Sequence, residues 1–228
     1  MKLRNGPRVL TINNYKGGSG KTTSTAYLLH CLQKRYGHRV IGIDADPQGS
    51  LLRWAALGEW EIPVFAMPSK TLHRQMWGVV DRDRFDIVVI DTPPLEQEAG
   101  IAASALWAAT DVIVPMAPTT MEMDRVGPVW MSIADAADRP DRVEALRARV
   151  LLNRTVARAA ATETARGLLE TTGRDVFTPT IPHRTGATGY GQAFGGPVDG
   201  DDIAYSAVAS TLLAQWSAQP LANAGITR

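Results

Sequence analysis

The chain has 228 residues, 45% of them hydrophobic and 21% charged, with a formal net charge of +1 at neutral pH. These values are typical of a globular chain long enough for a substantial core, and they exclude a polyelectrolyte that binds nucleic acid through its overall charge. Cys31 is the single cysteine, which excludes a disulfide framework and a metal site built on cysteine pairs, and we expect it to be a buried, inert thiol.

Short apolar runs alternate along the chain with helical patterns. Strands are predicted at residues 9–13, 40–44, 62–66, 87–91, 112–116, 150–153 and 177–181. Helices are predicted at residues 22–35, 50–57, 71–80, 100–109, 121–137, 160–172 and 203–217. Because the central runs are rich in Val and Ile, as strands buried on both faces are, the sequence predicts an α/β fold. We expect a doubly wound, mostly parallel sheet with helices on both faces, in one domain spanning residues 1–228.

A glycine-rich loop joins the first predicted strand to the first helix. Its sequence is Lys16-Gly17-Gly18-Ser19-Gly20-Lys21-Thr22-Thr23. Three glycines let the backbone N–H groups turn inward, which makes an anion-binding nest at a helix N-terminus. We expect Lys21 to reach the β- and γ-phosphates of a nucleotide, and the Thr22 hydroxyl to bind Mg²⁺. A glycine-rich loop alone could be an ordinary turn, but the two lysines, the two threonines and the preceding strand favour phosphate binding.

Aspartates end two of the predicted strands, at the sheet edge where doubly wound folds bind ligands. Asp44 and Asp46 follow the second strand and project to the same side of an extended chain. One of them can meet the metal shell while the other holds an attacking water. Residues 46–49, Asp-Pro-Gln-Gly, also fit a helix-capping turn. Asp91 ends the fourth strand after four aliphatic residues and precedes Thr-Pro-Pro, a Walker B pattern whose carboxylate binds Mg²⁺, usually through water.

The plain phosphate-loop pattern has a glycine six residues before its lysine, and Tyr15 occupies that position. The loop with its extra lysine, the Asp-Ala-Asp-Pro-Gln segment and the Walker B strand resemble the ParA/MinD family of deviant Walker ATPases, a class of P-loop NTPase. The short plasmid-partition ParA proteins are the most similar, since no helix-turn-helix extension precedes the first strand. The resemblance covers residues 9 to about 216. It implies an ATPase with slow basal turnover that uses ATP and Mg²⁺, in which Asp46 orients the hydrolytic water and stands with Thr22 and Asp91 around the metal.

Lys16 is a second cation, upstream of the nest, and we expect it to project away from its own pocket. In the resembled family the signature lysine crosses a face-to-face dimer and contacts the phosphates bound by the other subunit, in the manner of an arginine finger. The resemblance therefore places Lys16 among the catalytic residues and links nucleotide binding to formation of a homodimer. A solvated lysine is the alternative.

The nucleotide base is expected to lie near the ends of the late strands. The Asn153 amide can both donate to and accept from adenine, although a turn asparagine is also possible. Residues 180–184 resemble the family segment Ile-Pro-Arg-Asn, whose backbone passes the adenine, and this makes Pro182 a candidate contact. His183 and Gly196 replace an arginine and a lysine that are usual in this region of the family, so the base contacts match the family less closely than the phosphate contacts do.

The resemblance also implies partners: non-specific DNA in the ATP state and a ParB-like adaptor protein that stimulates hydrolysis. From residue 139 to residue 184 the chain has nine arginines and five acids, a local excess of +4. A basic patch for DNA phosphates could be built from Arg147, Arg149, Arg154, Arg158, Arg166 or Arg184. Arginines spread over a solvated surface are the alternative, and residues 199–202 are acidic where the family is often basic.

The predicted function is a ParA-like ATPase that segregates or positions plasmid DNA, chromosomal DNA or another large cargo. One alternative is a MinD-like positioning or regulatory ATPase without DNA binding. Another is a metabolic or metal-delivery relative, although a single cysteine argues against iron–sulfur or arsenite chemistry.

A cytoplasmic protein, associated with the nucleoid when ATP is bound, is predicted. Residues 1–7 contain no signal-peptide pattern, and the most apolar window, residues 99–118, is interrupted by polar residues and proline. The helix at 203–217 lacks Lys and Arg, unlike the basic membrane helix of MinD-type relatives. We expect it to pack on the core through Trp216, without membrane binding. The glycine-rich loop at 186–202 is expected to be a functional or mobile segment.

Overall fold

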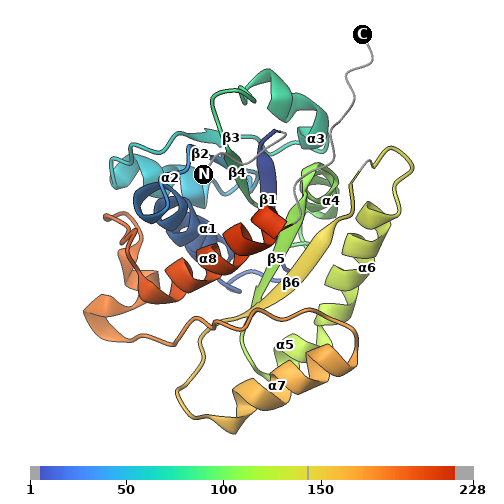
Figure 1. The fold of residues 1–228 in the computed structure, drawn as a ribbon, viewed down its shortest axis with the longest axis vertical. Coiled ribbons are helices and arrows are strands. Elements are labelled where there is room, and N and C mark those ends of the chain that lie inside the picture. Colours follow the sequence, from blue (N-terminus) through green and yellow to red (C-terminus); the bar gives the residue numbers. More distant parts are fainter. Residues whose placement is uncertain (1–5, 143, 219–228) are drawn as a thin grey trace.

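The computed structural model describes residues 6–142 and 144–218 and contains one six-stranded parallel sheet (Figure 1). The strands are β1 (Arg8–Ile12), β2 (Val40–Asp44), β3 (Val64–Ala66), β4 (Ile87–Asp91), β5 (Asp111–Met116) and β6 (Arg147–Leu152). Their order across the sheet is β3-β2-β4-β1-β5-β6, and every strand pair is parallel. The predicted doubly wound α/β fold is confirmed.

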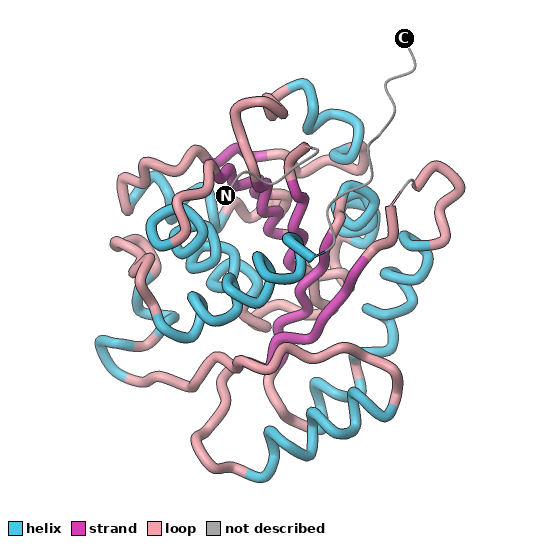
Figure 2. Tube along the Cα trace, in the orientation of Figure 1, coloured by secondary structure: helices cyan, strands magenta, loops and turns pink. Residues whose placement is uncertain are grey.

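Helices cover both faces of the sheet (Figure 2). One face carries α1 (Lys21–His30), α2 (Ser50–Leu57) and α8 (Ile203–Ala218). The other face carries α3 (Leu72–Gln75), α4 (Ala99–Ala108), α5 (Thr120–Asp124) and α6 (Val126–Ala137). Helix α7 (Ala160–Thr171) packs beside β6. Because successive strand residues point to opposite faces, Leu10 and Ile12 of β1 pack in the core under α1 and α8, whereas Val9 packs under α3 and α4. Helix α8 packs as predicted, with Trp216 only 1% exposed. The described part of the chain contains no helix long and apolar enough to cross a membrane.

The predicted strand at residues 177–181 is wrong. The residues flanking this segment form two isolated bridges with β6 and its extension, Val150 with Val176 and Thr155 with Pro182, and the Ile181 N–H donates to the Leu152 carbonyl at 2.9 Å. Pro179 and Pro182 have no N–H to donate, so a continuous ladder cannot form here. The predicted strand at 62–66 likewise begins only at Val64, after a proline.

Other predicted boundaries shift for local reasons. The predicted helix at 121–137 is interrupted at Arg125, because Pro128 cannot donate to the carbonyl four residues earlier. The predicted helix at 71–80 ends at Gln75 and continues as a 3-10 turn through Gly78. Helix α1 begins at Lys21, one residue before the predicted start, and a π-helical segment (Cys31–Arg35) extends it.

A buried ionic cluster joins three strands. Arg8 in β1 is only 2% exposed, and its guanidinium lies 4.0 Å from the Asp111 carboxylate. Arg147 in β6 donates to the other Asp111 oxygen at 3.1 Å. Burial lowers the pKa of Arg8, and the Asp111 charge opposes that shift. The Arg8 guanidinium also lies 5.8 Å from the Trp216 ring, so the cluster ties helix α8 to the sheet.

Asp111→Ala is expected to lower the free energy of unfolding by about 3 kcal/mol, because it removes the carboxylate that compensates a buried guanidinium. Urea denaturation measures the change. Asp141→Ala is the control, since Asp141 pairs with Arg139 at 2.6 Å on the surface, where ion pairs contribute little. Equal losses of stability in the two variants would show that the Asp111 cluster is not stabilising.

Candidate functional site

The predicted phosphate motifs meet at the carboxyl edge of the sheet. β1 leads into the glycine loop, and its last residue, Ile12, is in register with Asp91 of β4. Asp91 is in turn in register with Asp44 of β2. Parallel pairing of three neighbouring strands therefore brings together motifs that lie about 30 to 80 residues apart in the sequence.

The glycine loop borders a hollow of about 370 Å³. Gly18 and Gly20 have φ angles of +73° and +93°, a left-handed conformation that glycine adopts without a steric penalty. A Cβ atom at Gly20 would lie 2.8 Å from the Asn153 amide nitrogen, so a larger residue is excluded there. Of the predicted site residues, those that line the hollow are Gly17, Gly18, Gly20, Lys21, Thr22, Thr23 and Asp46.

Lys21 is the first residue of α1 and is only 6% exposed. Its Nζ donates to the Lys16 carbonyl oxygen at 2.9 Å. Burial lowers the pKa of Lys21, while the nearby Asp91 and Asp46 carboxylates act in the opposite direction and favour the charged form. An ammonium group that lines the hollow can exchange a loop carbonyl for a phosphate oxygen, which is the stronger, charge-assisted acceptor.

Thr22 and Asp91 supply oxygen atoms suited to Mg²⁺. The Thr22 hydroxyl donates to Asp91 Oδ2 at 2.6 Å, and the Thr25 hydroxyl lies 3.4 Å from Oδ1. Burial raises the pKa of Asp91 to about 7, against the Thr22 hydrogen bond. Hydroxyl and carboxylate oxygens are hard ligands of the kind that Mg²⁺ prefers. Within the described ranges no group of three or more His, Cys, Asp or Glu could hold a metal ion by itself.

The two aspartates at the end of β2, Asp44 and Asp46, have different surroundings in the structure. Asp44 is fully buried, and its carboxylate accepts from the N–H groups of Asp46 at 3.1 Å and Leu52 at 2.9 Å. Burial raises the pKa of Asp44. Asp46 is half-buried and lines the hollow, and its Oδ1 accepts from the Gln48 N–H at 2.9 Å. The capping turn predicted at residues 46–49 matches the contact of Asp46 with the Gln48 N–H, while the first turn of α2 is capped by Asp44, and Asp46 is the carboxylate beside the hollow.

Lys16 and Ser19 are the two predicted loop residues that do not line the hollow. The Lys16 Nζ lies 4.0 Å from Glu96 Oε2, and the two side chains are 35% and 31% exposed. Ser19 is buried, and its hydroxyl donates to the Lys16 carbonyl at 3.3 Å. The Lys16 ammonium is therefore held beside its own hollow by a partly exposed, loose ion pair.

A second hollow of about 530 Å³ adjoins the first, and both are lined by Gly20 and Thr23. Asn153 and Pro182, the two residues predicted near the base, both line it. The Asn153 amide nitrogen donates to the Ser19 carbonyl at 2.7 Å. Its buried Oδ1 has no hydrogen-bond partner among the described residues. Asn153 thus holds the glycine loop and also keeps one acceptor available to a ligand.

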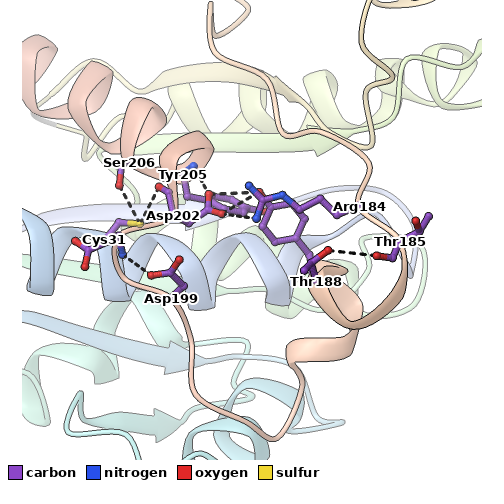
Figure 3. Close-up of polar contacts among 10 residues, drawn as sticks. Cys31, Arg184, Thr185, Thr188, Asp199, Asp202, Tyr205 and Ser206 are labelled. Atoms are coloured by element: carbon purple, nitrogen blue, oxygen red, sulfur yellow. Dashed lines mark hydrogen bonds and ion pairs between the residues drawn. The ribbon is translucent and has the colours of Figure 1, made fainter.

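The glycine-rich loop before α8 forms a wall of the second hollow and is held by buried Asp202 (Figure 3). Asp202 Oδ2 accepts from the Tyr190 hydroxyl at 3.1 Å and from Arg184 Nη1 at 2.8 Å. The Arg184 guanidinium lies 4.6 Å from the Tyr190 ring centre. On the other side, the Trp54 indole of α2 donates to the Gly196 carbonyl at 3.0 Å. These contacts fix to the core a loop that the sequence predicts to be functional or mobile.

Residues near Asp202 also have structural partners. Asp201 pairs with Lys34 at 2.7 Å, so part of the acidic charge at residues 199–202 is neutralised within the chain. Cys31 is buried next to Asp202, and its thiol contacts the Asp202 carbonyl and the Ser206 hydroxyl (Figure 3). Burial raises the pKa of Cys31 to about 11, which keeps the thiol protonated at neutral pH. The predicted burial of this cysteine is confirmed.

The arginines predicted to form a basic patch are largely engaged within the protein. Four of the six donate to a carboxylate or to a backbone carbonyl. These contacts are Arg147 with Asp111, Arg154 with Gly18, Arg166 with Phe177 and Arg184 with Asp202. Two of these arginines, Arg147 and Arg184, pair with a carboxylate, whereas Arg154 and Arg166 keep their full charge beside a neutral carbonyl.

Arg154, Glu96 and Thr25 are among the residues of the site that are absent from the sequence-based prediction of nucleotide contacts, and Gln48, Ser50, Pro94 and Gln97, which line the first hollow, are absent too. Arg154 lines both hollows, although the sequence analysis assigns it to a surface patch. Its position directly after Asn153, at a strand end, is a signal that could have placed it here. Thr25 lies one helical turn beyond Thr22, which accounts for its contact with the same carboxylate.

Comparison with known proteins agrees with this geometry. A model of the CobQ/CobB/MinD/ParA nucleotide binding domain matches residues 10–189. "Maintenance of carboxysome distribution protein A" of Gloeobacter kilaueensis is 35% identical over 117 residues, which are 51% of this chain and 52% of that protein. The protein of the same name from Halothiobacillus neapolitanus is 27% identical over 179 residues, covering 77% and 79%. The chain thus matches about half the length of the first relative and about four fifths of the second.

Among solved structures, the chain is similar to cobyrinic acid a,c-diamide synthase from Mycobacterium smegmatis with bound ADP and magnesium. The TM-score is 0.67 at 27% identity, and the match covers 92% of this chain and 96% of that one. The family match spans well over half of the chain and includes the glycine loop, Asp46 and Asp91. The chain therefore belongs to the CobQ/CobB/MinD/ParA nucleotide-binding domain family.

Proposed function

We propose that the chain is a magnesium-dependent ATPase that uses the state of its nucleotide to position a large cargo, with plasmid or chromosomal DNA as the first candidate. The observation that carries this proposal is the 2.6 Å contact between the Thr22 hydroxyl and Asp91, at the mouth of a glycine loop whose hollow is also lined by Asp46. This is the arrangement that hydrolysis of a nucleoside triphosphate requires: a phosphate cradle, oxygen ligands for a metal, and a carboxylate that can hold water.

The two hollows divide the nucleotide between them. The phosphates lie in the first hollow against the loop N–H groups and Lys21, and adenine lies in the second against Asn153 and Pro182. Thr22, Asp91 and Asp46 are the residues that would hold Mg²⁺, which when bound neutralises charge on the β- and γ-phosphate oxygens. Asp46 orients the water that attacks the γ-phosphorus, the bond to the bridging oxygen breaks, and ADP and phosphate are released.

Lys16 makes the active form a homodimer. Its ammonium group lies outside the lining of its own hollow, and its ion pair with Glu96 is loose, at 4.0 Å, so it is available to the phosphates of a second subunit. Bound ATP then strengthens dimerisation, and dimerisation strengthens ATP binding, because the two equilibria are linked. Basal turnover is slow, and a ParB-like adaptor protein stimulates it.

Non-specific DNA binding in the ATP state follows from the partition-protein resemblance and is supported by the arginine excess between residues 139 and 184. Dimerisation would double that surface. With this DNA binding, the protein is expected in the cytoplasm, and on the nucleoid when ATP is bound. The pairing of Arg147 and Arg184 with carboxylates favours the second candidate function, a positioning ATPase that does not bind DNA.

Light scattering after gel filtration, together with retention on non-specific duplex DNA, tests the proposal with ATP and with ADP. We expect a dimer that is retained on DNA with ATP at low salt, and a monomer that is not retained with ADP. Lys16→Ala is the matched variant, expected to bind ATP yet remain monomeric. An ATP-dependent dimer that ignores DNA would support the second candidate. Absence of any ATP binding by the wild type would overturn the nucleotide-switch proposal itself.

A further inference from the structure

Arg154 lies at the junction of the two hollows, and its side chain reaches the glycine loop. Its Nη2 donates to the Gly18 carbonyl at 2.6 Å. The residue before it, Asn153, donates from its amide to the Ser19 carbonyl at 2.7 Å. Two consecutive residues after β6 therefore hold two consecutive carbonyl groups of the phosphate loop.

The backbone at Arg154 has an unusual conformation that permits this contact. The Asn153 N–H still donates to the Met116 carbonyl, so pairing with β5 continues to that residue. Arg154 then has a φ of +51°, a left-handed value that residues with a Cβ atom rarely adopt. Backbone strain of this kind clusters at functional sites, and at Arg154 it is accompanied by the contact with the Gly18 carbonyl.

Peptide geometry connects the Arg154 contact to anion binding. In a planar trans peptide the C=O and the following N–H point in opposite directions. Fixing the Gly18 carbonyl toward Arg154 therefore turns the Ser19 N–H away from Arg154, and Asn153 does the same for the Gly20 N–H. These are loop N–H groups of the kind that form an anion nest, and both are oriented by donors on the far side of their peptides.

We propose that Arg154 is a positioning residue that keeps the phosphate loop in its anion-binding conformation before nucleotide arrives. The inference rests on the proposed nucleotide-binding function. Arg154 acts through the loop, and the loop receives the β-phosphate of both ATP and ADP. Loss of the guanidinium should therefore weaken the binding of ATP and of ADP by the same factor. Loss of a cation that contacts the γ-phosphate would instead weaken the binding of ATP alone.

Arg154→Gly is the informative variant, because glycine adopts a φ of +51° freely, so the side chain with its guanidinium is removed without adding backbone strain. We expect the affinities for ADP and for a non-hydrolysable ATP analogue each to fall about tenfold, as one charge-assisted hydrogen bond is lost. Without nucleotide, the amides of residues 17–20 should exchange with deuterium faster than in the wild type. Arg154→Lys should restore part of the affinity, since lysine keeps the charge and one donor but not the guanidinium geometry.

Glu59→Gly is the matched backbone control. Glu59 is an exposed residue with a φ of +49° that does not line either hollow. It should keep wild-type affinity for both nucleotides. Unchanged affinity and unchanged exchange in Arg154→Gly would overturn the inference, as would a loss confined to the ATP analogue. If the wild type binds neither nucleotide, the proposed function fails instead, and the two failures are distinguishable.

Discussion

Lys21→Ala is expected to weaken binding of both ATP and ADP about a hundredfold or more. The Lys21 ammonium group lines the phosphate hollow with carboxylates nearby, and each charge-assisted hydrogen bond to a phosphate is worth roughly 1.5–3 kcal/mol. The variant should remain folded, because the substitution removes the hydrogen bond from the Lys21 ammonium group to the Lys16 carbonyl, which is a contact within the loop. Titration calorimetry with each nucleotide measures the loss.

Lys34→Ala is the control for Lys21. Lys34 lies in the π-helical extension of α1, where its ammonium pairs with Asp201 at 2.7 Å on an exposed surface, away from both hollows. It should bind ATP as the wild type does, which separates the effect of a local charge from that of net charge. Normal ATP affinity in Lys21→Ala would remove Lys21 from the phosphate site.

Asp46→Ala is expected to keep ATP binding but to reduce turnover about a hundredfold or more, the usual scale for losing a positioned general base or water-orienting group. Asp46 lines the hollow, whereas the carboxylate of neighbouring Asp44 accepts hydrogen bonds from two backbone N–H groups. Because hydrolysis would then no longer release the ATP state, we also expect the dimer to accumulate. Single-turnover phosphate release and light scattering measure the two effects.

Asp135→Ala provides the comparison, since Asp135 is an exposed aspartate of α6 outside the hollow. Its turnover should equal that of the wild type. Wild-type turnover in Asp46→Ala would show that Asp46 does not hold the water. Loss of ATP binding in Asp46→Ala would instead assign the carboxylate mainly to the metal.

The parts of the fold that follow from local pattern were predictable. Continuous Val and Ile runs identify β1, β2 and β4, and the glycine loop after β1 needs only its own residues to adopt its turn. The failures are also local in origin. Pro179 and Pro182 interrupt the predicted seventh strand, and Pro128 divides the predicted fifth helix, so proline positions deserved more weight than apolar content there.

The site required more than local pattern. Asp44 ends β2 and Asp46 lies two residues later with the same side chain, yet the first caps a helix and the second lines a hollow. That difference depends on where α2 begins, at Ser50, because the Leu52 N–H needs an acceptor. Sequence analysis could therefore assign the pair of aspartates to the site but could not assign each one from its residues alone.

The sequence by itself determined the parallel α/β fold, the glycine loop with Lys21 and Thr22, and the strand-end carboxylate Asp91, because each depends on contiguous residues and strand periodicity. Only the tertiary structure decided the placement of Arg154, which contacts Gly18 across 136 residues of sequence, and the anchoring of the late loop by Asp202. Such contacts depend on how distant segments pack, and an arginine that binds a loop carbonyl has the same local sequence as one that faces solvent.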